Sequence, residues 1–204
     1  MKLFGSPGSP YVRKVLVAQY EKNIACEFIL DRPSDPQTRV PQYNPLGKVP
    51  VVLLDDGQSL YDSSVIVEYF DGLGSGARLI PDSFVERIKV RQGEALGDGI
   101  VDATVALTHD SRYTKDTDPH STWYQKQLLK INRGLAELES LVKKNSFCYY
   151  NQFSLADICA GMALAYLDRA YPVLNWRHQY PGLHTYSNLL FLRPSFIKAY
   201  PKET

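Results

Sequence analysis

Cysteine is scarce in this chain, and its spacing excludes several kinds of site. The three cysteines, Cys26, Cys148 and Cys159, lie far apart, and no C-x-x-C motif occurs. An odd number of widely spaced cysteines argues against a disulfide framework and against a cysteine zinc site. The four histidines also lack the spacing of metal ligands. The sequence therefore predicts reduced, structural cysteines and no bound metal.

Long apolar runs and an excess of one charge are lacking as well. The longest apolar run, Ile158 to Leu167, is about half the ~20 residues needed to span a bilayer. Prolines, glycines and basic residues interrupt the amino-terminal stretch before a signal-peptide core can form. A net charge of +1, with lysine and arginine spread evenly, produces no field that gathers nucleic acid or an anionic membrane. We therefore expect a cytoplasmic globular protein that binds neither nucleic acid nor membrane.

The chain contains two parts with different periodicity. The first seventy-odd residues alternate short apolar strands with helices, in the order β-α-β and then β-β-α, whereas the residues from about Phe84 onward show only helical spacing. A segment rich in glycine and other turn residues, around 74–81, separates the parts. We predict an α/β plus all-α protein, with a βαβ-ββα domain over residues 1–77, a linker over 78–84 and an all-helical domain over 85–204.

The helices of the second part show three notable patterns. A polar stripe shares one face of a helix over about 84–109, and it is either a solvated ladder of ion pairs or the lining of a cleft or subunit contact. Thr122 to Lys144 has the apolar spacing of an amphipathic helix that packs and does not react. Ser154 and Asp157 have capping-box spacing and begin an almost wholly apolar helix. The polar stripe on the helix over about 84–109 consists of Arg87, Arg91, Glu94, Asp98 and Asp102.

The turn before the first helix of the first part contains Ser6, Pro7, Gly8, Ser9 and Pro10. Ser9 suits a helix N-cap, and Pro10 suits the first helical position. The N–H groups and the dipole at a helix N-terminus favour a negative charge on phosphate, carboxylate or thiolate. Ser9 is therefore either a simple cap or a hydroxyl that donates to a bound anion. No His-Asp arrangement is assignable that would make it a nucleophile.

Two further turns in the first part have comparable alternatives. A cis Val49–Pro50 peptide would turn the Val49 N–H and C=O outward to pair with an extended peptide, whereas a trans peptide would be an ordinary strand start. Asp62 and Ser63 open the third helix, either as a simple cap or as a site for the ammonium and carboxylate groups of an amino acid. Together the three turns suit a thiol, a peptide backbone and an amino-acid end, which describes glutathione.

The chain resembles the cytosolic glutathione transferases over nearly its whole length, most of all small bacterial members with a serine at the start of the first helix. The resemblance implies a thioredoxin-like N-terminal domain, an all-helical C-terminal domain, a cis Pro50 and a homodimer with its active site near the subunit contact. The segments that carry it are Ser9-Pro10-Tyr11-Val12-Arg13-Lys14-Val15, Asn44-Pro45-Leu46-Gly47-Lys48-Val49-Pro50-Val51, Asp62-Ser63, Ser154-Leu155-Ala156-Asp157-Ile158 and Arg193-Pro194-Ser195-Phe196.

The resemblance also implies a role for each site residue, with glutathione as co-substrate. Ser9 would be the catalytic residue and would hydrogen-bond the glutathione sulfur. Val49 would pair with the cysteinyl backbone, Asp62 and Ser63 would hold the γ-glutamyl end, and Lys48 is a candidate for the glycyl carboxylate. Asp62 departs from the family, which more often has the longer Glu or Gln at this position.

Two features of the sequence around the first turn bear on the sulfur chemistry that this turn supports. Ser6 is a second hydroxyl on the same loop and competes with Ser9 for the sulfur. The stretch Ser9 to Val12 also resembles the Cys-Pro-Tyr-Cys of glutaredoxins, but both thiols are missing. Dithiol exchange at this site is therefore excluded.

The expected function is glutathione transfer to a small electrophile, by addition or substitution, with a role in detoxification. Lowering a thiol pKa of ~8.5 by about two units requires roughly 2.7 kcal/mol, which one hydrogen bond to the anion and the helix dipole can supply. The electrophile would lie between Pro7, Tyr11 and the long helix that follows the linker, around His109 and Tyr113. The alternatives are a glutathione-dependent peroxidase or reductase, and a non-catalytic transferase-like module that binds a protein.

Overall fold

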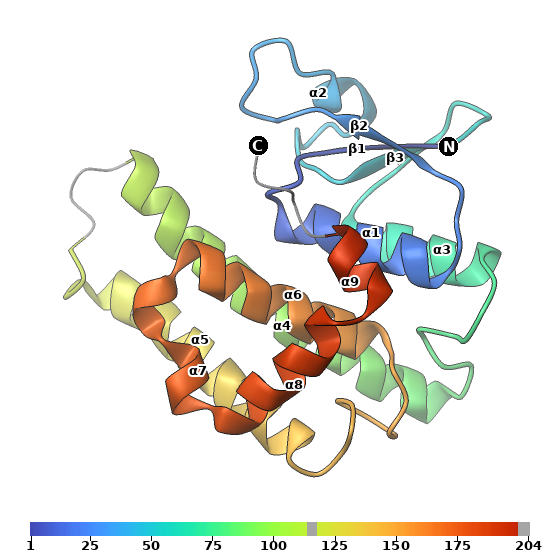
Figure 1. Cartoon of the computed structure of the whole chain (residues 1–204). Coiled ribbons are helices and arrows are strands. Elements are labelled where there is room, and N and C mark those ends of the chain that lie inside the picture. The colour runs from blue at the N-terminus through green and yellow to red at the C-terminus, as the bar shows by residue number, and fades with distance from the viewer. Residues whose placement is uncertain (114–117, 200–204) are drawn as a thin grey trace. The chain divides into compact units, whose positions relative to one another are not determined.

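The structure is a computed structural model that describes residues 1–113 and 118–199, with only the backbone described for 109–113. The chain forms two compact units (Figure 1). The first unit consists of Met1–Ile80 and the segment that begins at Arg193, and the second consists of Pro81–Leu192. The segment from Arg193, which the prediction assigned to the helical domain of residues 85–204, thus groups with the first unit.

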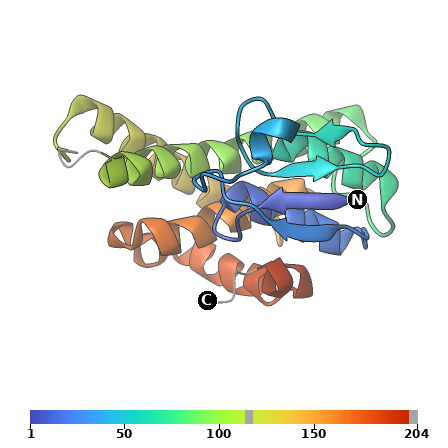
Figure 2. The ribbon, with the colours of Figure 1, turned by 90° about the horizontal axis from the view of Figure 1, so that it is seen from above.

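The first unit is a mixed α/β layer with the predicted βαβ-ββα order. The strand order in its four-stranded sheet is β2-β1-β3-β4 (Figure 2), with β1 parallel to β2 and antiparallel to β3, and β3 antiparallel to β4. Its elements are β1 (Lys2–Gly5), α1 (Pro10–Glu21), β2 (Glu27–Leu30), α2 (Val40–Tyr43), β3 (Val51–Leu53), β4 (Ser59–Leu60), α3 (Ser63–Leu73) and α9 (Pro194–Ala199).

Tight packing fixes the start of α1 against the end of β1. Leu3 and Phe4 are buried, as the apolar start of the chain predicts. A Cβ added at Gly5 would lie 2.7 Å from the side chain of Val12 on α1. Only glycine therefore allows this close approach of strand and helix. The approach sets the path of the turn that contains Ser9.

Helices α1 and α3 lie on one face of the sheet (Figure 1), and α9 packs against α1. The Glu21 carboxylate at the end of α1 accepts hydrogen bonds from Arg193 Nη2 at 2.9 Å and from Ser195 Oγ at 2.5 Å. Nearer the start of α1, Arg13 Nε donates to the Ala199 carbonyl at 3.1 Å. These contacts explain why α9 groups with the first unit although it is distant in sequence.

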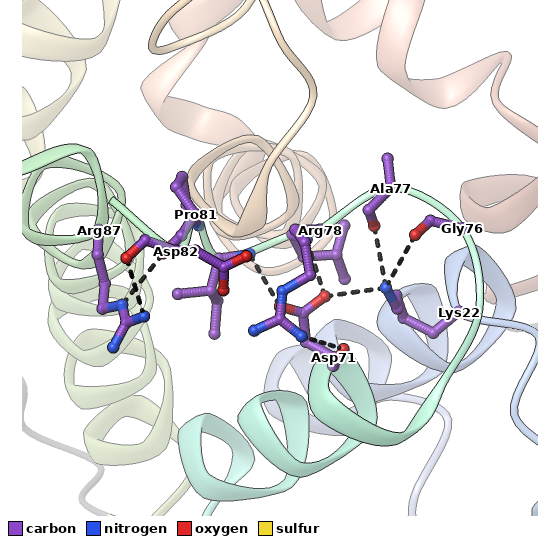
Figure 3. A network of polar contacts seen from close by, with 10 residues as sticks. Lys22, Asp71, Gly76, Ala77, Arg78, Pro81, Asp82 and Arg87 are labelled. Atoms are coloured by element: carbon purple, nitrogen blue, oxygen red, sulfur yellow. Dashed lines mark hydrogen bonds and ion pairs between the residues drawn. The ribbon is translucent and has the colours of Figure 1, made fainter. Parts of the chain in front are cut away.

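A buried ion pair joins the far ends of α1 and α3 (Figure 3). Lys22 Nζ lies 3.1 Å from the Asp71 carboxylate, and both side chains are 1% exposed. Lys22 also donates to the Ala77 carbonyl at 3.0 Å, and Asp71 accepts from the N–H groups of Leu79 and Ile80 at 2.8 and 3.1 Å. The network therefore fixes the chain that leaves α3.

The second unit is helical throughout its described elements. The axis of its core is α6, whose residues 155–167 are all buried. Its elements are α4 (Phe84–Tyr113), α5 (Thr122–Val142), α6 (Leu155–Ala170), the 3₁₀ helix η1 (Pro172–Leu174), α7 (Trp176–Gln179) and α8 (Pro181–Phe191). Arg87 on α4 donates to the carbonyls of Pro81 and Asp82 and so fixes the chain that enters this helix (Figure 3).

Two glycines allow α4 to approach α6 closely. A Cβ added at Gly93 would lie 2.6 Å from Ala156, and one at Gly97 would lie 2.7 Å from Cys159. Either substitution would therefore push the helices apart. Helix α4 continues to Tyr113, past the predicted end near His109. The prediction also omitted η1 and α7, which are short and lack a sustained periodic pattern.

Hydrogen bonds to one buried carboxylate, that of Asp157, complete the start of α6. Ser154 and Asp157 form the predicted capping box. Asp157 also accepts from the Cys148 N–H at 2.8 Å and from the Tyr186 hydroxyl at 2.5 Å. Burial raises the pKa of Asp157, and these donors oppose the increase.

None of the described helices combines the length and the apolar character that a membrane span requires.

Candidate functional site

The strand register determines which turns of the first unit lie together. Phe4 on β1 is opposite Val51 on β3, and Val52 on β3 is opposite Leu60 on β4. In an antiparallel pair the end of one strand lies beside the start of the other. The residues that follow β1 and β4 therefore reach the same edge of the sheet as the residues that precede β3.

The structure thus brings together the three turns that the sequence analysis singled out. We call this part of the molecule the three-turn edge and define it as residues 6–10, 48–50 and 61–63. It contains Ser9 at the start of α1, Val49 before β3, and Asp62 and Ser63 at the start of α3. Two helix N-termini and a strand start therefore present their backbone groups at one place.

Ser9 caps α1 through a long hydrogen bond. Its backbone is extended, with φ −77° and ψ 126°, and its Oγ accepts from the Val12 N–H at 3.4 Å. That distance is beyond the usual range for N–H···O bonds, so the cap is weak. A serine hydroxyl that accepts such a bond still has its own proton to donate. The half-buried Ser9 side chain therefore combines a helix N-terminus with an available O–H donor.

Ser6 lies one turn earlier and contributes mainly its backbone. Its carbonyl accepts from the Ser9 N–H at 2.9 Å, which closes the turn between β1 and α1. The Ser6 side chain is half-buried, like that of Ser9. Both hydroxyls belong to the three-turn edge, and only Ser9 stands at the helix N-cap.

The Val49–Pro50 peptide is cis, as the resemblance implies. Among the described residues, none donates to the Val49 carbonyl or accepts from the Val49 N–H. Buried Asn44 supports this turn, because its Nδ2 donates to the Lys48 carbonyl at 2.8 Å and its Oδ1 accepts from the Leu46 N–H at 3.0 Å. The Val49 N–H and C=O are therefore available to pair with an extended peptide, and the hydrogen bonds of Asn44 hold the backbone of this turn in place.

Asp62 and Ser63 differ in exposure, and of the two only Asp62 is the N-cap of α3. Asp62 is exposed and caps α3, accepting from the Ser64 N–H at 3.0 Å. Ser63 is only 4% exposed. Capping uses one carboxylate oxygen, so Asp62 keeps the capacity to accept from a ligand ammonium group. Lys48, the candidate for a terminal carboxylate, is exposed beside Val49.

The residues predicted to line an electrophile pocket are divided between the two units. Pro7 and Tyr11 are half-buried in the first unit, at the turn before α1 and in its first turn. His109 and Tyr113 belong to α4 of the second unit, and their side chains lie outside the described residues. The pocket therefore stays a prediction.

The polar stripe on α4 is partly buried and not simply solvated. Glu94 is buried and forms an ion pair with Arg91 at 2.7 Å. Glu94, Asp98 and Cys159 place possible metal-ligand atoms within 4.8 Å of one another. Because a guanidinium group already balances the Glu94 charge, Glu94 itself gives a cation little unbalanced negative charge. The absence of a metal site stays a prediction.

Sequence reasoning missed two contributors near the three-turn edge. Asn44 follows a helical turn and precedes Pro45, which is a common turn signal, but its bonds to the Lys48 turn depend on the fold. Lys14 is fully buried, and its Nζ donates to Ser64 Oγ at 3.3 Å. A lysine four residues after the helix start gives no local sign of such burial.

Comparisons with known proteins agree with this architecture. Family models for the glutathione S-transferase N-terminal and C-terminal domains match residues 3–78 and 121–188. An uncharacterised GST-like protein of Escherichia coli K12 is 35% identical over 202 residues, which cover 98% of each chain.

Solved structures are similar over nearly the whole chain. A glutathione S-transferase from Methylobacillus flagellatus, solved with GSH bound, is 43% identical with a TM-score of 0.94, covering 98% of this chain and 99% of the other. One from Methylobacterium radiotolerans, in complex with glutathione sulfonate, is 36% identical with a TM-score of 0.91, covering 100% and 95%. A family member from Pseudomonas fluorescens with bound glutathione is 36% identical with a TM-score of 0.86, covering 99% of each chain.

Proposed function

Since the chain belongs to the glutathione S-transferase family, we propose that it binds glutathione along the three-turn edge and transfers it to small electrophiles. The observation that carries the site assignment is the Ser9 hydroxyl, a weakly used cap at a helix N-terminus with a proton to donate. The similar structures that contain GSH, glutathione or glutathione sulfonate support the choice of ligand. Residues 1–77 would form the glutathione-binding domain.

Ser9 would stabilise the thiolate of glutathione. Its O–H donates to the sulfur, and the N-terminal dipole of α1 adds favourable electrostatics at the same point. The thiolate then forms a carbon–sulfur bond with the electrophile, either by addition or with departure of a leaving group. Ser9 keeps its own proton throughout, so the reaction needs no base to activate the serine.

The other turns would bind the remainder of the tripeptide. The Val49 N–H and C=O pair with the cysteinyl backbone as an added strand. Asp62 accepts from the γ-glutamyl ammonium group, and Ser63 at the N-terminus of α3 donates to the γ-glutamyl carboxylate. Lys48 neutralises the glycyl carboxylate. The electrophile would approach beside Pro7 and Tyr11, with His109 and Tyr113 as further pocket residues.

We also propose a cytoplasmic homodimer with a role in detoxification. An exposed apolar stripe on α3 supports self-association, because Val65, Tyr69 and Leu73 recur at four-residue steps and are 48%, 37% and 57% exposed. Sedimentation at micromolar concentration tests the assembly. A dimer that Tyr69→Glu converts to monomers is expected, and a monomeric parent protein would contradict the proposal.

Binding and turnover assays test the proposed function. The parent protein is passed over immobilised glutathione and its thermal unfolding is measured with and without free glutathione. Aryl halide and hydroperoxide substrates are then compared. Retention, a raised unfolding temperature and conjugation of the aryl halide are expected. Turnover of hydroperoxides alone would identify a peroxidase, and a protein without retention or thermal shift would be a non-catalytic binding module.

A further inference from the structure

We propose that Lys14 is a positioning residue for glutathione, which sets the position of the Asp62–Ser63 turn relative to Ser9. The inference rests on the proposed function. Lys14 would touch no part of the ligand. It would act through Ser64, whose hydroxyl accepts from the Lys14 ammonium group at 3.3 Å.

Lys14 is placed to join the two helix starts of the three-turn edge. It lies five residues after Ser9 on α1, and helical side chains lean toward the N-terminus of their helix. Ser64 is the second residue of α3, directly after Ser63, and its N–H donates to Asp62 at 3.0 Å. The side chain and the backbone N–H of Ser64 therefore connect Lys14 on α1 to the carboxylate of Asp62.

The burial of Lys14 indicates a specific role. Its side chain is 1% exposed, and burying an ammonium group has a large desolvation cost unless it is hydrogen-bonded or paired. A methionine or leucine would fill similar volume without this cost. The ammonium group supplies a directional bond, which an apolar side chain lacks.

The same pair of helices has a second lysine contact, which is a natural control. Lys22 pairs with Asp71 at 3.1 Å, eight residues along α1 and seven residues along α3 from the Lys14–Ser64 contact. Two turns of each helix separate the contacts. Both contacts hold α1 against α3, but only the Lys14–Ser64 contact adjoins the three-turn edge.

The test compares glutathione with cysteinylglycine, which lacks the γ-glutamyl group. In Ser64→Ala, kcat/KM for glutathione is expected to fall about tenfold through a higher KM, with kcat at saturation and kcat/KM for cysteinylglycine nearly unchanged. The preference is the ratio of kcat/KM for glutathione to kcat/KM for cysteinylglycine. Lys14→Met should lower this ratio as much as Ser64→Ala does, and the double variant should lower it little further. Lys14→Arg should retain most of it. If Lys14→Met does not fold, Ser64→Ala alone still decides the outcome.

Asp71→Asn is the matched control at the far contact. It should lower the unfolding temperature and leave the preference for glutathione unchanged. The proposal is overturned if Ser64→Ala keeps the full preference, or if Asp71→Asn loses as much of it. A parent protein that binds no glutathione would overturn both the proposed function and the Lys14 assignment. A parent that binds glutathione, with Ser64→Ala keeping the full preference, would overturn the Lys14 assignment alone.

Discussion

Ser9 in the first unit and Ser154 in the second both start a helix, yet their surroundings differ. Ser154 is buried, and its N–H and O–H both donate to the Asp157 carboxylate, at 2.8 and 2.9 Å. Ser9 is half-buried, and its Oγ accepts one long bond from Val12. Among the described residues, none accepts from the Ser9 O–H.

The difference separates a cap that stabilises the fold from a cap that can also bind. Buried polar groups that find all their partners within the chain contribute to stability and specificity of packing. A cap that leaves one donor unused at a sheet edge, beside the unused backbone groups of Val49, can satisfy that donor only with water or a ligand. The comparison therefore predicts different effects when each cap is removed: mainly a loss of stability at the Ser154–Asp157 cap and mainly a loss of turnover at Ser9.

The largest expected effect is on stability, in the second unit. Asp157→Ala should lower the free energy of unfolding by about 3–5 kcal/mol, because it removes the carboxylate that accepts from the buried donors of Ser154, Cys148 and Tyr186. Denaturant unfolding of the full chain measures this. Glu137→Ala, on the exposed face of α5, is the control and should change little. A loss of less than 1 kcal/mol in Asp157→Ala, roughly the value of a single surface bond, would remove the distinction between the two caps.

The next effect is on turnover, in the first unit. Ser9→Ala should lower kcat/KM for conjugation about 10- to 100-fold, because a hydrogen bond to the developing thiolate is lost. Glutathione should still bind, and the free energy of unfolding should fall by no more than about 1 kcal/mol. Steady-state kinetics and denaturant unfolding measure the two changes. Ser6→Ala is the matched control, and activity lost there but kept in Ser9→Ala would transfer the donor role to Ser6.

The smallest effect concerns a third cap and depends on pH. Glu139 accepts from the N–H groups of Gly182 and Leu183 at the start of α8 and pairs with Lys143 at 3.0 Å. Burial acts to raise its pKa, but these hydrogen bonds and the Lys143 charge outweigh burial and lower it. A lowered carboxyl pKa gives stability that is present above the unfolded value of ~4.3 and is lost as pH falls through the folded value.

Glu139→Gln should therefore lower the free energy of unfolding by about 1 kcal/mol at neutral pH, and the difference from the parent should shrink below about pH 4. Unfolding curves across the acid range measure it. Turnover per folded molecule should not change, because Glu139 caps α8 and is not one of the proposed site residues. A difference that grows toward low pH would contradict the assigned direction of the pKa shift.

Much of the fold could be predicted from the sequence, because helix starts and strand periodicity depend on residues that are close together in the chain. Ser9 and Pro10 located the start of α1, and the spacing of Ser154 and Asp157 located the start of α6. The order of strands and helices followed from periodicity. The three turns came together as a candidate site because each has a polar or cis-prone start, and the family resemblance then related them to one ligand.

Other features depend on contacts between residues far apart in sequence. Lys14 and Ser64 are 50 residues apart, and Asp71 pairs with Lys22, which lies 49 residues earlier. Arg193 attaches α9 to α1 through Glu21, 172 residues away. No local pattern distinguishes these side chains from ordinary surface charges, so sequence reasoning could not predict their burial or their partners.

Titration of the glutathione thiol on the protein tests the central claim, that Ser9 stabilises the thiolate, most directly. Thiolate absorbance in the ultraviolet follows the bound thiol in the parent protein and in Ser9→Ala. We predict that the parent lowers the thiol pKa by about two units from its free value of ~8.5, and that Ser9→Ala restores at least half of that shift. A Ser9→Ala protein that binds glutathione and lowers its thiol pKa as far as the parent does would contradict the account.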